Sequence, residues 1–198
     1  MHTPLASALM ARSFPRLAEW IRDALLIVAG SLLVAAMAQV RIPLLFTPVP
    51  ITGQTFAVLL VGAALGARRG AASLSFYLLQ GLLGAPVFAG GKGGLIHLFG
   101  PTGGYLLGFI AAAWLVGRLA EQGQDRRVST ALVAFLLGEI VIYLFGLPWL
   151  AIFVGWEKAF LAGLIPFLPG DAIKLLAAAL ALPAAWRLLS SFHSQKSS

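Results

Sequence analysis

Two charged residues three positions apart, Asp171 and Lys174, form the pair in this sequence best suited to binding a polar ligand. They follow Pro169 and Gly170 and precede an apolar run, so they would open a helix and share one of its faces. Asp171 suits the positive end of a helix dipole, whereas Lys174 opposes it. An ion pair between the two would explain both residues, and a bound anionic ligand would explain Lys174 better.

A second candidate site is the stretch 84–105, GAPVFAGGKGGLIHLFGPTGGY, which holds eight of the chain's 22 glycines. Lys92 lies within it, between the aromatic residues Phe88 and Tyr105. Glycine lets backbone or ligand approach closely, and non-helical backbone survives at membrane depth only where protein buries it or where it lines a cavity. The stretch is therefore either a turn between two membrane helices or the lining of a ligand site.

Two further polar residues interrupt apolar runs. Glu139 would lie mid-helix, either as a functional acid or as a packing residue hydrogen-bonded to Tyr143 one turn on. Gln80 would lie near the end of a helix, where it could reach a ligand or bond across to another helix.

No catalytic or cofactor constellation appears in the sequence. The chain has no cysteine, and its three histidines (His2, His97 and His193) are far apart, which argues against a shared metal site. Neither a G-x-S-x-G motif nor a P-loop occurs, so we expect no catalytic residues, no metal or cofactor and no hydrolysis of nucleotides by this chain.

The composition is that of an integral membrane protein that contacts the lipid bilayer. Hydrophobic residues make up 60% of the 198 residues and charged residues only 11%, against about 25% in soluble domains. The net charge of +7 does not indicate nucleic-acid binding, because the basic residues are scattered between apolar runs. We therefore predict a single membrane domain over residues 1–198.

The apolar runs predict an all-α, six-helix transmembrane bundle over residues 20–189, with a polar segment 1–19 before it and a flexible tail 190–198 after it. Proline-rich and aromatic segments interrupt the bundle, and Pro148 is expected to stop the fifth helix. The six predicted helices cover residues 21–40, 51–67, 71–83, 103–119, 130–146 and 170–186.

Six spans place both termini on one side of the membrane. Ten of the 14 basic residues then fall on the side of the termini and four on the other, so the positive-inside rule predicts cytoplasmic termini. The proline-rich segment, the glycine-rich stretch, the aromatic segment and Asp171 all fall on the outer face. This convergence predicts an outward-facing ligand pocket.

Three motifs of the chain occur in this order: TPVPITGQTFAVLLVGAALG, GAPVFAGGKGGLIHLFGPTGGYLLGF and PFLPGDAIKLLAAAL. Together they resemble the BioY family, the biotin-specific S components of energy-coupling factor (ECF) transporters. The resemblance implies a multi-pass protein of a bacterial or archaeal cytoplasmic membrane that captures biotin. It also implies a T subunit and two cytoplasmic ATPases as partners, which fits the missing P-loop.

Carried over by position, Asp171 and Lys174 match the acid and lysine of the family's last helix. Lys92 lies in the loop where the family places ligand contacts, Gln80 lies near it, and Phe88 and Tyr105 could pack the ligand's rings. S components typically meet the T subunit through A-x-x-x-A on the first helix. The nearest match here is Ser31 and Ala35, with serine in the first place.

Three alternatives to biotin capture stay open at this stage. The same pocket could capture another small carboxylate-bearing vitamin. An intramembrane enzyme acting on a lipid or isoprenoid would need clustered acids, histidines or metal ligands, which the sequence lacks. A structural helper without a ligand would leave Lys174 and the shared outer mouth unexplained.

Overall fold

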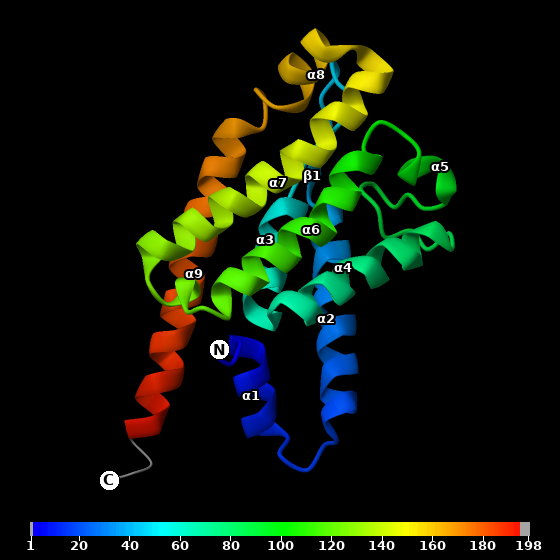
Figure 1. Cartoon of the computed structure of the whole chain (residues 1–198). Coiled ribbons are helices and arrows are strands. Elements are labelled where there is room, and N and C mark those ends of the chain that lie inside the picture. Colours follow the sequence, from blue (N-terminus) through cyan, green and yellow to red (C-terminus); the bar gives the residue numbers. More distant parts are fainter. Residues whose placement is uncertain (1, 195–198) are drawn as a thin grey trace.

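The computed structural model describes residues 2–194, which form a bundle of helices with two short strands and one 3-10 turn (Figure 1). The elements, in chain order, are α1 (Leu5–Ser13), α2 (Glu19–Gln39), β1 (Arg41–Ile42), β2 (Ile51–Thr52), α3 (Gln54–Leu65), α4 (Ala67–Leu82), α5 (Leu95–Leu98), α6 (Gly103–Ala120), η1 (Gln124–Arg126), α7 (Val128–Val154), α8 (Trp156–Gly163) and α9 (Leu168–Ser194).

Four helices of the described chain, α2, α6, α7 and α9, are long and apolar enough to cross a membrane. The other two predicted spans are shorter. At about 1.5 Å per residue, the 12 residues of α3 and the 16 of α4 extend about 18 and 24 Å, less than the roughly 30 Å of a hydrocarbon core. The structure confirms a bundle of apolar helices, and helix length by itself supports four membrane spans among the described residues.

Several predicted boundaries are wrong for local reasons. The break between α3 and α4 lies at Gly66, whose φ of +84° favours glycine, and not at Arg68 to Gly70. Pro148 does not stop α7, which continues to Val154. The proline removes only the amide that would bond the carbonyl of Leu144, and membrane helices tolerate such a loss.

Both predicted end segments are more helical than expected. The segment 1–19 contains α1, whose Leu5 is buried in a hydrophobic cluster together with residues of α3, α6, α7 and α9. At the other end, α9 continues to Ser194 instead of ending near Trp186. The rest of the predicted tail, residues 195–198, lies outside the described residues.

The central helix of the bundle is α6. Of its most apolar 18 residues 61% are buried, compared with 22% in α2, 33% in α7 and 28% in α9. It packs against α3, α4 and α7. Because α2, α7 and α9 keep most of their apolar surface on the outside, that surface is available to lipid.

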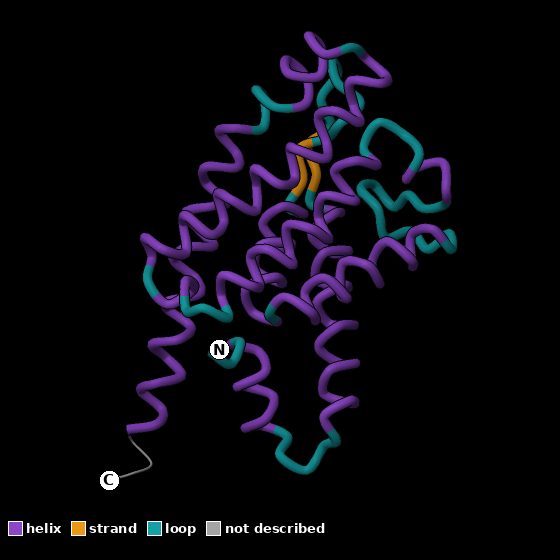
Figure 2. Tube along the Cα trace, viewed as in Figure 1, coloured by secondary structure: helices purple, strands orange, loops and turns teal. Residues whose placement is uncertain are grey.

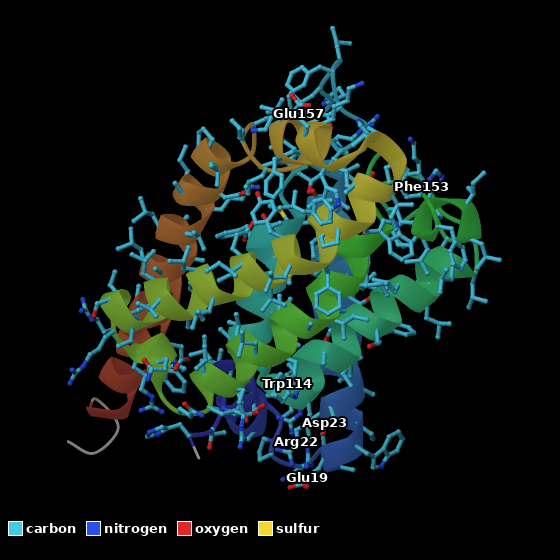
Figure 3. The ribbon with its side chains drawn as sticks, turned by 45° about the horizontal axis from the view of Figure 1, so that its top comes forward. Glu19, Arg22, Asp23, Trp114, Phe153 and Glu157 are labelled. Carbon is cyan, nitrogen blue, oxygen red and sulfur yellow. The ribbon has the colours of Figure 1, made fainter. Side chains whose placement is uncertain are left out.

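The two ends of the bundle differ in composition. The loops with β1, β2, α5 and α8 gather at the upper end in Figures 1 and 2, and α1 and the last turns of α9 lie at the lower end. Glu157 projects at the upper end in Figure 3, while Glu19, Arg22 and Asp23 lie at the opposite end. There the Arg69 side chain joins three helices, because it pairs with Asp23 at 2.8 Å and donates to Ser7.

Asp125 in η1 joins the α6–α7 connection to α9. It is 3% exposed, it accepts a hydrogen bond from the indole N–H of Trp186, and the Arg126 guanidinium lies 4.5 Å from the centre of the Trp186 ring. Burial raises the pKa of Asp125 above its ordinary value, and the Trp186 hydrogen bond and the nearby Arg126 charge offset part of that rise.

This raised pKa predicts how stability depends on pH. A carboxyl with a higher pKa in the folded state stabilises the fold fully below its unfolded pKa of about 3.9, and this contribution is lost as pH rises through the folded value. Asp125→Asn keeps an acceptor for Trp186 without the charge. The melting temperature of this variant relative to the parent should therefore increase as pH rises from about 4.5 to about 8. Glu157→Gln, at an exposed position, is the control. A difference in melting temperature between Asp125→Asn and the parent that stays constant with pH would contradict the prediction.

Candidate ligand-binding site

A cavity of about 410 Å³ opens among the three irregular segments that the sequence placed at one mouth. Its wall includes Pro48 from the proline-rich segment, Phe88 and Lys92 from the glycine-rich stretch, and Phe167 just before α9. The volume suits a small-molecule ligand, for which sites of roughly 300–1,000 Å³ are usual. The predicted convergence of these segments on one cavity is confirmed.

Asp171 and Lys174 meet at one end of this cavity, which we call the floor. The Lys174 ammonium donates to Asp171 Oδ1 at 3.0 Å and to Thr55 Oγ1 of α3 at 3.1 Å. The Tyr143 hydroxyl of α7 donates to the second carboxylate oxygen, Oδ2. The Asp171 side chain is 5% exposed and that of Lys174 is 18% exposed, so the pair is largely desolvated.

The start of α9 changes the argument for Lys174. The helix begins at Leu168, so Lys174 lies in its second turn and not in its first. The helix dipole acts mainly within the first turn, so it opposes this ammonium less than the sequence suggested. The stronger argument is burial, since a desolvated ion pair needs further hydrogen bonds, which Thr55 and Tyr143 supply.

The glycine-rich stretch folds as a loop over the cavity and is tied to the bundle at several points. Gln39, the last residue of α2, donates to the carbonyl of Phe88 at 3.2 Å and accepts from the Gly91 amide at 2.9 Å. Phe88 is 3% exposed, and its ring lies edge-on to Tyr77 at 5.6 Å. Lys92 is exposed at the mouth of the cavity.

Tyr105 joins the cavity wall to α8. Its hydroxyl donates to the carbonyl of Gly163 at 2.9 Å, and its ring lies edge-on to Tyr143 at 6.2 Å. Trp149 does not line the cavity; its indole N–H donates to the carbonyl of Gly100 and so anchors the loop from α7. Five of the six predicted binding residues therefore line one cavity: Asp171, Lys174, Lys92, Tyr105 and Phe88.

Gln80 is the exception, because its side chain bonds to a neighbouring helix. Its Oε1 accepts a hydrogen bond from the Ser31 hydroxyl at 2.8 Å, so it bonds α4 to α2 and does not line the cavity. Ser31 is fully buried, and Ala35 is half-buried against the same core. A Cβ on the neighbouring Gly30 would lie 2.7 Å from the Ser73 Oγ of α4. Ser31 and Gly30 of α2 thus pack against α4 inside the chain, and the contact of Ser31 and Ala35 with a separate subunit stays a prediction.

Sequence reasoning missed two groups at the floor, Thr55 and the contact of Tyr143 with Asp171. Lys174 and Thr55 are 119 positions apart, and no local pattern pairs them. Tyr143 carried a partial signal, since it lies one turn from Glu139 in an apolar run; its hydroxyl reaches Asp171 instead. Gln54 also lines the cavity, and its side-chain amide donates to the Tyr77 hydroxyl at 2.9 Å.

A family model described as the BioY family matches residues 6–191. The chain belongs to the BioY family. Among its relatives, "Biotin transporter BioY" of Rhizobium etli is 41% identical over 169 residues, which cover 80% of this chain and 90% of that protein. The protein of the same name from Thermotoga maritima is 42% identical over 149 residues, covering 75% and 86%.

The fold has a counterpart of known structure. The "S-component for biotin from an ECF-type ABC transporter", solved by crystallography, matches with a TM-score of 0.78 and 25% identity, and the match covers 86% of this chain and 95% of that one. "Probable biotin transporter BioY" of Pyrococcus horikoshii is 45% identical over 127 residues, 64% of this chain and 74% of that protein. Membership of the BioY family and the apolar helices make this a multi-pass membrane protein.

Proposed function

We propose that this protein is the substrate-capture subunit for biotin uptake, the S component of an ECF transporter. The observation that carries the proposal is the Asp171–Lys174 pair, held by Thr55 and Tyr143 at the floor of a cavity of about 410 Å³ in a BioY family chain. The names of the relatives are those of transporters, so the intramembrane enzyme is set aside.

The chemistry of biotin fits the two ends of this cavity. Its ureido ring has two N–H donors and one carbonyl acceptor, and its valerate chain ends in a carboxylate. Asp171 accepts an N–H with lone pairs that Lys174 and Tyr143 leave free, and Lys174 has one N–H left for a carbonyl. Lys92 and Arg41 at the mouth attract the carboxylate, while Phe88 and Tyr105 pack against the ring system.

Transport requires further subunits in this proposal. The chain contains no P-loop, so a separate module with a T subunit and two cytoplasmic ATPases supplies the energy. The face of α2 with Ser31 and Ala35 stays the predicted contact with the T subunit.

Equilibrium binding of labelled biotin to the purified, detergent-solubilised protein tests the proposal. We expect saturable binding that unlabelled biotin displaces. Absence of saturable biotin binding, together with saturable binding of a different labelled carboxylate-bearing vitamin, would instead support capture of that other vitamin.

We also propose six spans, with the short α3 and α4 completed by their flanking turns, in a bacterial or archaeal cytoplasmic membrane. Both termini and the segment 1–19 lie in the cytoplasm, and the cavity opens outward. The excess of basic residues on the side of the termini, ten against four, supports this orientation.

Single cysteines test the orientation, since the chain has none of its own. Glu157 at the α8 end and Gln122 after α6 are both exposed. In intact cells an impermeant thiol reagent should label Glu157→Cys and leave Gln122→Cys unlabelled. Both should react once the cells are permeabilised. The reverse pattern in intact cells would invert the topology.

A further inference from the structure

Glu139 is a buried acid of α7 that the proposed contacts do not yet use. It is 5% exposed and lines the ligand cavity. It also lines a second, apolar hollow of about 640 Å³ between α7, α8 and α9, whose wall includes Leu144, Trp156 and Phe160. Glu139, Tyr143 and Asp171 line both hollows and therefore form the polar partition between them.

The hydrogen bonding of Glu139 is incomplete. Its Oε1 is buried and has no hydrogen-bond partner among the described residues, whereas both oxygens of Asp171 have one. Unpartnered buried oxygens are rare in folded proteins. An acid that lines the ligand cavity with a free, desolvated oxygen has the capacity to bond a ligand there.

The groups around Glu139 do not provide a cation for it alone. Asp171 and Lys174 of α9 pair with each other, the hydroxyl of Tyr143 is engaged with Asp171, and that of Tyr105 of α6 is engaged with Gly163. From α3, the neutral Thr55 and Gln54 face the cavity. The remaining charged or titratable groups that line the cavity lie at its mouth, and they are Arg41, Lys92 and His97.

This arrangement favours the neutral form of Glu139. An ionised Glu139 would place a second negative charge in the same cavity as Asp171, whose own charge already pairs with the Lys174 ammonium. Desolvated charges without their own partner are strongly disfavoured. A neutral carboxyl instead offers one donor and one acceptor side by side.

We propose that Glu139 contacts the captured ligand as a neutral carboxylic acid, donating its O–H to a ligand carbonyl oxygen and accepting a ligand N–H at Oε1. This inference rests on the proposed function, because biotin supplies the cyclic urea. The cis N–H and carbonyl of that urea match the donor and acceptor of the neutral Glu139 carboxyl. Glu139 becomes acceptor-only when it loses its proton. It then repels the ligand carbonyl and the Asp171 carboxylate, so capture weakens at high pH.

Affinity for labelled biotin, measured from about pH 6 to about pH 9.5 with the melting temperature at each pH, tests this role. The parent should lose about tenfold in affinity across the range. Glu139→Gln keeps a hydrogen-bond donor and an acceptor without a titrating proton. At about pH 6 its affinity should therefore lie within roughly threefold of the parent's, and it should not lose affinity as pH rises. Glu139→Leu should lose about tenfold or more at every pH. His97 and Lys92 are present in all variants, so the difference between parent and Gln profiles belongs to Glu139.

Glu157→Gln, the same change at an exposed acid of α8, should follow the parent profile. Identical pH profiles for the parent and Glu139→Gln would overturn the role of Glu139 and leave biotin capture standing. Parent-like affinity in a folded Glu139→Leu variant would also overturn the role of Glu139. If that variant does not fold, the pH profiles of the parent and Glu139→Gln decide. Absence of biotin binding by the parent at every pH would overturn both proposals.

Discussion

Asp171→Asn is expected to lower the affinity for biotin by about tenfold or more, and Lys174→Met by at least as much. Hydrogen bonds to charged groups contribute roughly 1.5–3 kcal/mol, and about 1.4 kcal/mol corresponds to tenfold in affinity. Asn keeps the shape of Asp171 but replaces one acceptor oxygen with a donor. Met keeps most of the aliphatic length of Lys174 but removes every donor, including those that reach Asp171 and Thr55.

The same two variants separate ligand binding from a purely structural ion pair. If the pair only stabilises the fold, each single variant should melt at a lower temperature. The double variant, Asp171→Asn with Lys174→Met, should then recover much of the loss, because it leaves no buried charge unpaired. Affinity would stay close to normal in all three. Near-normal affinity in both single variants would reject the contact of this pair with biotin.

Gly117→Ala is expected to destabilise the bundle strongly for a change of one methyl group, because Gly117 lies where α6 meets the start of α4. A Cβ at this position would lie 2.4 Å from the backbone nitrogen of Ala67 and 2.4 Å from the carbonyl carbon of Gly66. Backbone atoms cannot rotate away, so the helices must separate. Overpacking of this kind costs about 1–3 kcal/mol, which exceeds the gain of at most about 1 kcal/mol in helix propensity.

Gly170→Ala is the matched control for this prediction, since it adds the same methyl group to a helix. No atom lies within 4 Å of a Cβ placed on Gly170. The variant should therefore melt at or slightly above the temperature of the parent. Thermal unfolding in detergent, monitored as the loss of soluble protein, compares the two variants. Equal melting temperatures for Gly117→Ala and Gly170→Ala would show that the contact between α6 and α4 adapts.

The sequence by itself determined the six main helices and their order, but not the short helix α1. Apolar runs and their polar or glycine-rich interruptions are local features, and the six predicted helices correspond to α2, α3, α4, α6, α7 and α9. The pair Asp171 and Lys174 was also accessible, because residues three apart share a helix face wherever the helix lies. Local signals were weaker at the helix ends, because Pro148 does not end α7 and the break between α3 and α4 lies at Gly66.

Only the tertiary structure decided what each helix face meets. Ser31 and Gln80 are 49 positions apart, and their hydrogen bond shows that the small face of α2 packs on α4 of the same chain. Thr55 and Tyr143 complete the floor because packing rotates α3 and α7 toward α9, bringing their hydroxyls to Lys174 and Asp171. The rotation of a helix about its axis depends on close contacts between distant segments, such as Gly117 against Ala67, and such contacts leave no periodic pattern along the chain.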